Sequence, residues 1–237
     1  MKEKYYLGAY WPGRVEPVDA YARRAATFLR LLAATEPTFS PWFEKAGFRA
    51  ESLMHPVATN EESLLSLFTT KYRRDATGVS FSAWNGEPDG ASTSLRFSCG
   101  STSELLPDLC VMDLPTTDDA RARVVTTPVL SQTLRATVEA WEPGWGVATS
   151  IAHRDLVSEF ATPGTFVGWM TYLSQHRGTV PPLPATVRVE PVGDKGTLII
   201  LTPERFTVSN PEHMALAEAV REQLDRAGLL KPLVTQV

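Results

Sequence analysis

The stretch VSFSAWNGEPDGASTSLRFSC, residues 79–99, decides the fold class. Apolar side chains occupy every second position, first at Val79, Phe81 and Ala83 and then at Leu95, Phe97 and Cys99. A period of two on each side of a turn rich in glycine and proline predicts a β-hairpin. Each strand then has one apolar face, and the helical segments before and after the hairpin are suited to cover it.

The helices are predicted from apolar residues at helical spacing. The first follows Pro17 and carries a stripe of five such residues, Tyr21, Ala25, Phe28, Leu29 and Leu32. Thr59 and Glu62 form a capping-box pattern that opens a second helix, which runs to Tyr72. Further helices are expected after Pro128, over 153–160 and after Asn210, with a short helical turn at 42–46. Residues 118–121 are expected to form an exposed loop.

Strands are expected at 5–11, 109–114, 145–151 and 166–173, with a second hairpin at 187–190 and 197–201. The predicted fold class is α+β, with mostly antiparallel sheet flanked by helices. We expect a single domain over residues 1–237. Its two parts, residues 1–142 and 145–237, read alike as strand, helix, three strands and helix, which suggests two similar halves.

Charge and cysteine content restrict the function. The net charge of −4 and the pI near 5.6 disfavour direct nucleic-acid binding, which normally needs a basic surplus. Cys99 and Cys110 are too few for a disulfide framework and lie in apolar, strand-like surroundings, so we expect buried free thiols. No apolar run is long enough to span a membrane, and the first residues lack the features of a signal peptide. We therefore expect no membrane partner and a cytoplasmic protein.

Catalytic and metal-binding motifs are missing from the sequence. It contains no nucleophile elbow, no zinc-binding HExxH pattern and no phosphate loop. Its four histidines (His55, His153, His176 and His213) are scattered and show no metal-ligand spacing. We therefore predict no catalytic residues, no metal and no cofactor. The alternative is a small hydrolase whose site is assembled from His153, Asp155 and other dispersed groups.

Tryptophans stand beside turn residues, at Trp11 before Pro12-Gly13, at Trp84 before Asn85-Gly86, and in WEPGWG, residues 141–146. Most of these rings are expected to plug the ends of the sheet. Trp84 has the same strand parity as Ser80 and Ser82, so it is the best candidate for an exposed aromatic side chain of the kind that is enriched in interface hot spots.

The order of these motifs resembles the immunity protein 52 family. The motifs are YLGAYW (6–11), FSAWNG (81–86), WEPGWG (141–146), GWMTYL (168–173), ERF (204–206), NPEH (210–213) and AGLL (227–230). They cover nearly the whole chain. The resemblance implies a non-enzymatic protein of bacterial polymorphic toxin or type VI secretion systems, which binds and neutralises a cognate toxin effector. It further implies that this toxin is of the nuclease type and that the immunity protein acts in the cytoplasm.

The toxin-binding surface is expected where aromatic and acidic residues lie on rigid supports. Nuclease sites are basic, so carboxylates attract the partner and compete with its nucleic acid. The candidate toxin-binding residues are Trp84, Glu87 and Asp89 at the hairpin turn, with Asp118 and Asp119 on the loop that follows the third strand.

Overall fold

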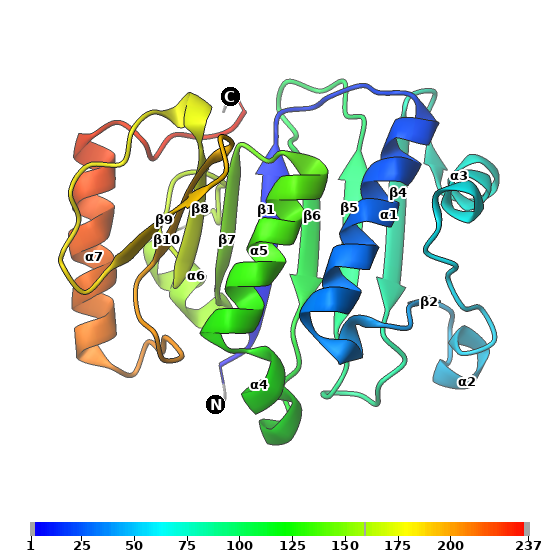
Figure 1. The fold of residues 1–237 in the computed structure, drawn as a ribbon, viewed down its shortest axis with the longest axis horizontal. Coiled ribbons are helices and arrows are strands. Elements are labelled where there is room, and N and C mark those ends of the chain that lie inside the picture. The colour runs from blue at the N-terminus through cyan, green and yellow to red at the C-terminus, as the bar shows by residue number, and fades with distance from the viewer. Residues whose placement is uncertain (1–2, 159, 235–237) are drawn as a thin grey trace.

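The computed structural model of the chain describes residues 3–158 and 160–234. Within them, ten strands form one antiparallel sheet in the order β2-β4-β5-β6-β1-β7-β8-β10-β9, and β3 also pairs with β4 (Figure 1). The strands are β1 (Tyr5–Trp11), β2 (Phe43–Glu44), β3 (Arg73–Arg74), β4 (Gly78–Trp84), β5 (Ser94–Cys99), β6 (Asp108–Asp113), β7 (Trp145–Ser150), β8 (Met170–Ser174), β9 (Arg188–Val192) and β10 (Gly196–Ile200). The predicted α+β class with antiparallel sheet is confirmed.

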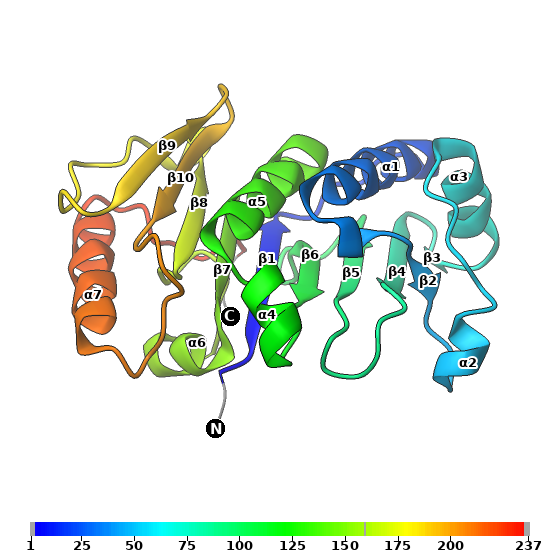
Figure 2. The ribbon, with the colours of Figure 1, turned by 60° about the horizontal axis from the view of Figure 1, so that its bottom comes forward.

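The longer helices lie mainly on one face of this sheet. Helices α1 (Val18–Thr35) and α5 (Thr127–Trp141) run side by side across it, and α3 (Glu61–Thr70) packs against α1. Figure 2 shows α6 (Ile151–Val157) on the opposite face and α7 (Pro211–Arg226) at the end that carries β8, β10 and β9. The shorter helices are α2 (Arg49–Ser52), α4 (Asp118–Val124), η1 (Pro37–Phe39) and η2 (Gln175–Arg177). None of the helices in the described ranges is long and apolar enough to cross a membrane.

The core is built around β1, which pairs with β6 on one side and β7 on the other. The ring of Trp11 stacks on that of Trp141 in α5, with centroids 5.7 Å apart and planes 14° apart. Trp141 also meets Phe28 of α1 and Phe97 of β5, and all four side chains are buried. As predicted, Trp11, Trp141 and Trp145 are buried. Trp11 and Trp141 lie on the side covered by α1 and α5, whereas Trp145 packs against Tyr10 and Phe166 on the other side of the sheet.

The predicted hairpin is formed by β4 and β5, in register from Val79 opposite Cys99 to Trp84 opposite Ser94. Its apolar face is buried, and Phe68 of α3 contacts both Phe81 and Phe97. The other face of the hairpin carries Ser80, Ser82, Trp84 and Arg96. The long helices α1, α3 and α5 do not cover it, and Arg49 of the short α2 reaches it at Trp84. We call this the helix-free face. In antiparallel sheets, one face is commonly packed on the core while the other is exposed to solvent.

Both cysteines are buried free thiols, as the sequence predicts. Burial raises the pKa of the Cys99 thiol and that of the Cys110 thiol, so both stay protonated at neutral pH. They pack in the core beneath the helices and offer no reactive group at the surface.

Local predictions differ from the structure in several places. The helix expected at 153–160 is α6, Ile151–Val157, and the strand expected at 166–173 is β8, Met170–Ser174. Residues 118–121 are not a loop but lie in α4, whose first turn holds two aspartates and whose last turn holds two arginines, an arrangement that complements the helix dipole. Phe43–Glu44 form a strand rather than a helical turn, because they pair with the edge of β4. The predicted capping box of Thr59 and Glu62 does not open α3. The helix begins at Glu61 and ends at Thr70, and its cap is Asn60, whose side chain accepts from the Ser63 amide at 2.9 Å.

The two predicted halves differ in how their strands are ordered. The first strand of the first half, β1, lies next to the last strand of that half, β6. The first strand of the second half, β7, lies next to the following strand, β8. The resemblance between the halves therefore remains a prediction about the order of elements along the chain, without support from strand order.

Candidate partner-binding site

Trp84 lies at the end of β4 on the helix-free face and is half-buried. Its ring is 6.4 Å from that of Phe43 in β2, and the guanidinium carbon of Arg49 lies 6.0 Å from its centroid. Its indole Nε1 is buried and has no hydrogen-bond partner within the described residues. Trp84 is therefore neither fully exposed nor a core plug: it is anchored by two neighbours and still reaches the surface.

The turn after Trp84 is held in place by its own side chains and backbone. The buried Asn85 donates from Nδ2 to the Thr38 carbonyl at 2.8 Å, and its Oδ1 accepts from the Thr93 amide at 3.0 Å. Further along, the Gly90 carbonyl accepts from the amides of Thr116 and Thr117 at 2.7 and 2.9 Å. Gly90 has a φ of +78°, a backbone conformation that suits glycine.

These bonds bring the two predicted acidic segments to one end of the sheet. Asp89 precedes Gly90, while Asp118 and Asp119 follow Thr117 at the start of α4. Figure 1 shows the β4–β5 loop and α4 at the same end of the sheet. We call the exposed or half-exposed carboxylates gathered here the acidic edge: Glu87, Asp89, Asp113, Asp118 and Asp119.

The carboxylates of the acidic edge are largely available to a partner. Among the described residues, Glu87, Asp89 and Asp119 make no side-chain hydrogen bond or ion pair. Asp118 pairs with Arg121 at 3.1 Å, and Asp113 accepts from the Ser94 hydroxyl at 3.1 Å. The edge can therefore attract a basic surface without first breaking strong internal pairs.

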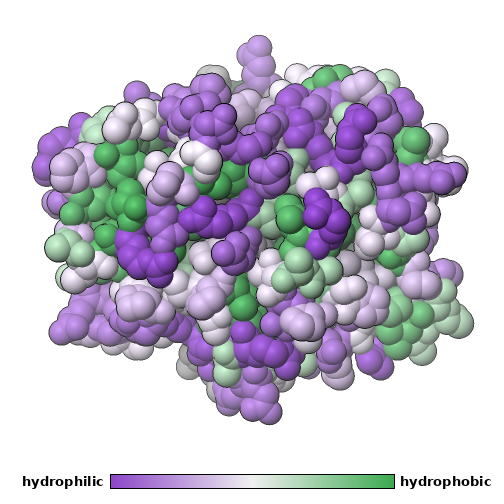
Figure 3. Space-filling view, in the orientation of Figure 1, coloured by the Kyte–Doolittle hydropathy of each residue, from purple (hydrophilic) through white to green (hydrophobic). Residues whose placement is uncertain are grey.

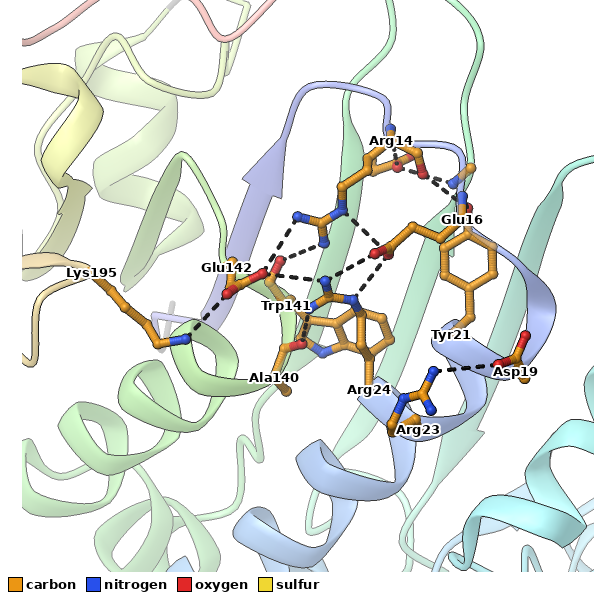
Figure 4. A network of polar contacts seen from close by, with 12 residues as sticks. Arg14, Glu16, Asp19, Tyr21, Arg23, Arg24, Ala140, Trp141, Glu142 and Lys195 are labelled. Carbon is orange, nitrogen blue, oxygen red and sulfur yellow. Dashed lines mark hydrogen bonds and ion pairs between the residues drawn. The ribbon is translucent and has the colours of Figure 1, made fainter.

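A cleft of about 840 Å³ opens at the opposite end of the sheet. It is lined by the segment that follows β1, the turn between α5 and β7, the end of β8 and the segment that follows α7. Figure 4 shows the ion-pair network on its wall. Glu142 lies 3.2 Å from Arg24 of α1, 3.3 Å from Lys195 and 3.8 Å from Arg14. Burial opposes ionisation of Glu142, but its bond to Lys195 and the charge of Arg24 prevail and lower its pKa. The cations are matched by carboxylates, so this network fastens α1, α5 and the β9–β10 turn together.

The two residues named for the alternative hydrolase site, His153 and Asp155, are not brought together. His153 is fully buried, with Nδ1 3.0 Å from the Thr149 hydroxyl and its ring against Phe206. Asp155 instead binds Arg154, with 2.8 Å between its Oδ1 and Nε. No hydrogen bond joins His153 to Asp155 among the described contacts, so the structure does not bring these two groups into a catalytic arrangement.

His213, near the start of α7, is also buried. It is 5% exposed, its Nδ1 accepts from the Thr207 amide at 3.0 Å, and its Nε2 lies 3.0 Å from Glu204. It packs flat against Phe206. Across the described ranges, no group of three or more histidine, cysteine or acidic side chains is placed to hold a metal ion.

Sequence reasoning missed Asp113, Arg49 and the segment 45–56 around α2. Asp113 joins the acidic edge only through the register of β6 with β5, where it stands opposite Ser94. The segment 45–56 has no apolar periodicity, so its position depends on contacts made elsewhere in the fold. Its only sequence signal is three large apolar residues, Phe48, Leu53 and Met54, in a short and otherwise largely polar stretch.

Comparison with known proteins gives two findings. The family model described as immunity protein 52 matches residues 3–233. A structure titled as a Pseudomonas aeruginosa T6SS protein has a similar fold, with a TM-score of 0.54 and 12% sequence identity; the match covers 93% of this chain and 72% of that chain. At this identity the likeness shows the fold alone. No curated protein matches the chain.

Proposed function

Because the chain belongs to the immunity protein 52 family, we propose that it binds and neutralises a cognate bacterial toxin effector and so protects the cell that makes it. The observation that carries this proposal is the family match over residues 3–233, nearly the whole described chain. The T6SS title of the protein with the similar fold agrees with a role in a type VI secretion or polymorphic toxin system.

The proposed mechanism is binding without chemistry. An inhibitor of this kind needs a surface that is held rigid before the partner arrives, because ordering side chains and loops on binding lowers affinity. The Asn85 and Gly90 hydrogen bonds supply that rigidity at the hairpin turn. We propose that Trp84, Glu87, Asp89, Asp118 and Asp119 form the toxin-binding site, together with Asp113.

The partner that suits this site is a nuclease-type toxin. Such an enzyme carries basic side chains where it holds the phosphate backbone. The acidic edge competes for those side chains, and it speeds the encounter by electrostatic attraction. Since a nuclease toxin damages nucleic acid inside the cell, we place the proposed activity in the cytoplasm, with no nucleic acid or membrane bound directly.

The test is co-expression with the toxin encoded beside this protein. Growth should stop when the toxin is made alone and resume when both proteins are made. A catalytically inactive toxin should co-elute with the immunity protein in gel filtration. If the neighbouring gene product is not toxic, or if no complex survives gel filtration, the proposal is wrong.

A further inference from the structure

The segment 45–56, which we call the α2 loop, projects from the edge of the sheet beside Trp84. Its neck is closed where Phe43 bridges to Pro56 and the Glu44 amide donates to the His55 carbonyl at 3.0 Å. The next pair, the Val57 amide and the Trp42 carbonyl, lies 2.8 Å apart. The chain thus leaves and re-enters the fold at one point, as in the compact surface loops that often carry function.

The α2 loop is held to the hairpin turn by polar contacts. Within the loop, the buried Ser52 hydroxyl accepts from the Ala46 amide at 2.8 Å. Towards the turn, Arg49 donates to the Gly86 carbonyl at 2.8 Å while its guanidinium lies beside the Trp84 ring. The position of the loop is therefore fixed without burying its largest apolar side chains.

Those side chains remain in water. Phe48 is 79% exposed and Met54 is 70% exposed, although they lie within one short loop. Figure 3 shows hydrophobic residues gathered at the corner of the molecule where α2 lies. Exposed to this extent, the two side chains contribute little to folding. Apolar groups clustered on a surface and rimmed by polar residues are typical of protein–protein contact sites.

We infer that the α2 loop is the apolar anchor of the toxin-binding site, an assignment that rests on the proposed function and adds Phe48 and Met54 to it. The occupant is a toxin surface with an apolar pocket edged by lysine or arginine. The apolar part follows from Phe48 and Met54, next to the half-buried Trp84. The basic part follows from the carboxylates beside them, Glu51 within α2 and Glu87 and Asp89 after Gly86, which outnumber the two cations of the loop. Those cations are Lys45 and Arg49, and Arg49 is already bound to the Gly86 carbonyl.

A second copy of this chain fits the same surface less well. In a two-fold symmetric dimer each patch meets itself. The surface around the α2 loop carries three carboxylates, Glu51, Glu87 and Asp89, against two cations, Lys45 and Arg49, so two copies would bring together an excess of like charge, which costs free energy at an interface. The net charge of −4 adds to that repulsion.

The experiment compares two double variants for binding to the catalytically inactive toxin encoded beside this protein. In the first variant, Phe48→Ser and Met54→Ser remove the anchor. In the control, Leu156→Ser and Phe160→Ser remove two side chains of comparable exposure, 67% and 79%, in and after α6, far from the α2 loop along the strand order (Figure 2). Both pairs are exposed, so both variants should unfold at the wild-type temperature. We expect the first variant to bind the toxin about 30-fold more weakly or worse, on the hot-spot scale, and the control to bind like wild type.

Each other outcome rejects a particular claim. If wild type binds the toxin and the Phe48/Met54 variant binds equally well, the anchor is wrong and the proposed function stands. If the control variant weakens binding as much as the first, the effect is not specific to the α2 loop and the anchor is again wrong. If wild type is a dimer that the Phe48/Met54 variant converts to a monomer, the surface belongs to a second copy. If wild type itself does not bind, the proposed function fails and this assignment fails with it.

Discussion

Trp84 is the residue at which folding and binding are most directly separable. It is half-buried against Phe43 and Arg49, whereas Trp141 is fully buried in the core. We expect Trp84→Ala to weaken toxin binding by ~2 kcal/mol or more, the hot-spot scale, and to lower the melting temperature only slightly. Trp141→Ala should instead cost ~3–5 kcal/mol of folding stability.

The measurement for Trp84 is calorimetric affinity together with thermal unfolding, on the same preparation. Trp141→Ala serves as the control for the loss of a core indole. A large fall in the melting temperature of Trp84→Ala, with unchanged affinity per folded molecule, would show that the ring acts as part of the fold instead.

His153 makes stability depend on pH. Burial lowers its pKa from 6.5 to about 4 in the folded protein. Between these values the unfolded chain binds more protons than the folded one, so acid favours unfolding. The folding stability that depends on a neutral His153 is fully present above pH 6.5, the pKa in the unfolded chain, and is lost as the pH falls towards 4. It amounts to about 3 kcal/mol at most, from the conversion of pKa to free energy.

Urea unfolding at about pH 7.5 and about pH 5 measures this effect. Wild type should lose stability on acidification, and His153→Gln should lose less over the same interval, whatever its absolute stability. Because the change of unfolding free energy with pH is compared, and not its absolute value, the packing cost of the substitution itself cancels. Equal slopes in the two proteins would contradict the assignment to His153.

The β4–β5 turn is the element whose order the proposed site needs most. Asn85 holds it through two hydrogen bonds of ordinary length, to the Thr38 carbonyl at 2.8 Å and from the Thr93 amide at 3.0 Å. Asn85→Ala leaves the buried Thr93 amide without this partner, at a cost of ~1–3 kcal/mol, and frees the half-buried Thr38 carbonyl. We expect lower stability, faster amide exchange over residues 86–92 and weaker toxin binding.

Asp89→Ala is the matched control for Asn85→Ala, because it changes the same turn at an exposed side chain that makes no described hydrogen bond. Its stability and amide exchange should equal those of wild type. If Asn85→Ala leaves the exchange of residues 86–92 unchanged, the turn is held by other contacts.

Elements with a long apolar repeat were predictable, and short ones were not. The stripe of α1 and the alternation of β4 and β5 record burial directly, since each repeat places one face against the core. Strand β2 and helix α4 lack such a repeat. The first depends on pairing with the edge of β4, and the second is favoured by charges at its ends.

The candidate site shows the same division. The sequence indicated Trp84 and the acidic residues as types of side chain, because an exposed aromatic and loop carboxylates are visible locally. Their grouping depends on the Gly90 bonds to Thr116 and Thr117, which join distant parts of the chain. The burial of His213 depends on Phe206, Thr207 and Glu204 in the loop before α7, and no apolar repeat reports these contacts.

The sheet as a whole separates two acidic regions that can be compared directly. The acidic edge lies at the end of the sheet near α4, whereas α7 lies beside β9 and β10, on the side of the molecule away from β4 (Figure 1). Glu222 and Asp225 of α7 are exposed, like Asp89 and Asp119. We compare two double variants that remove the same charge, two units from a net of −4, at different places. The first is Asp89→Asn with Asp119→Asn, and the second is Glu222→Gln with Asp225→Asn.

We expect the Asp89/Asp119 variant to associate with the toxin about 3–10-fold more slowly at low salt, and the α7 variant to associate at nearly the wild-type rate. Charges close to the docking surface steer the encounter, while distant ones are screened. The difference should vanish near ~0.5 M salt, where the screening length falls to a few ångströms. Stopped-flow association over a salt series measures both effects. Equal slowing by the two variants would show that net charge, rather than the position of the acidic edge, drives the encounter.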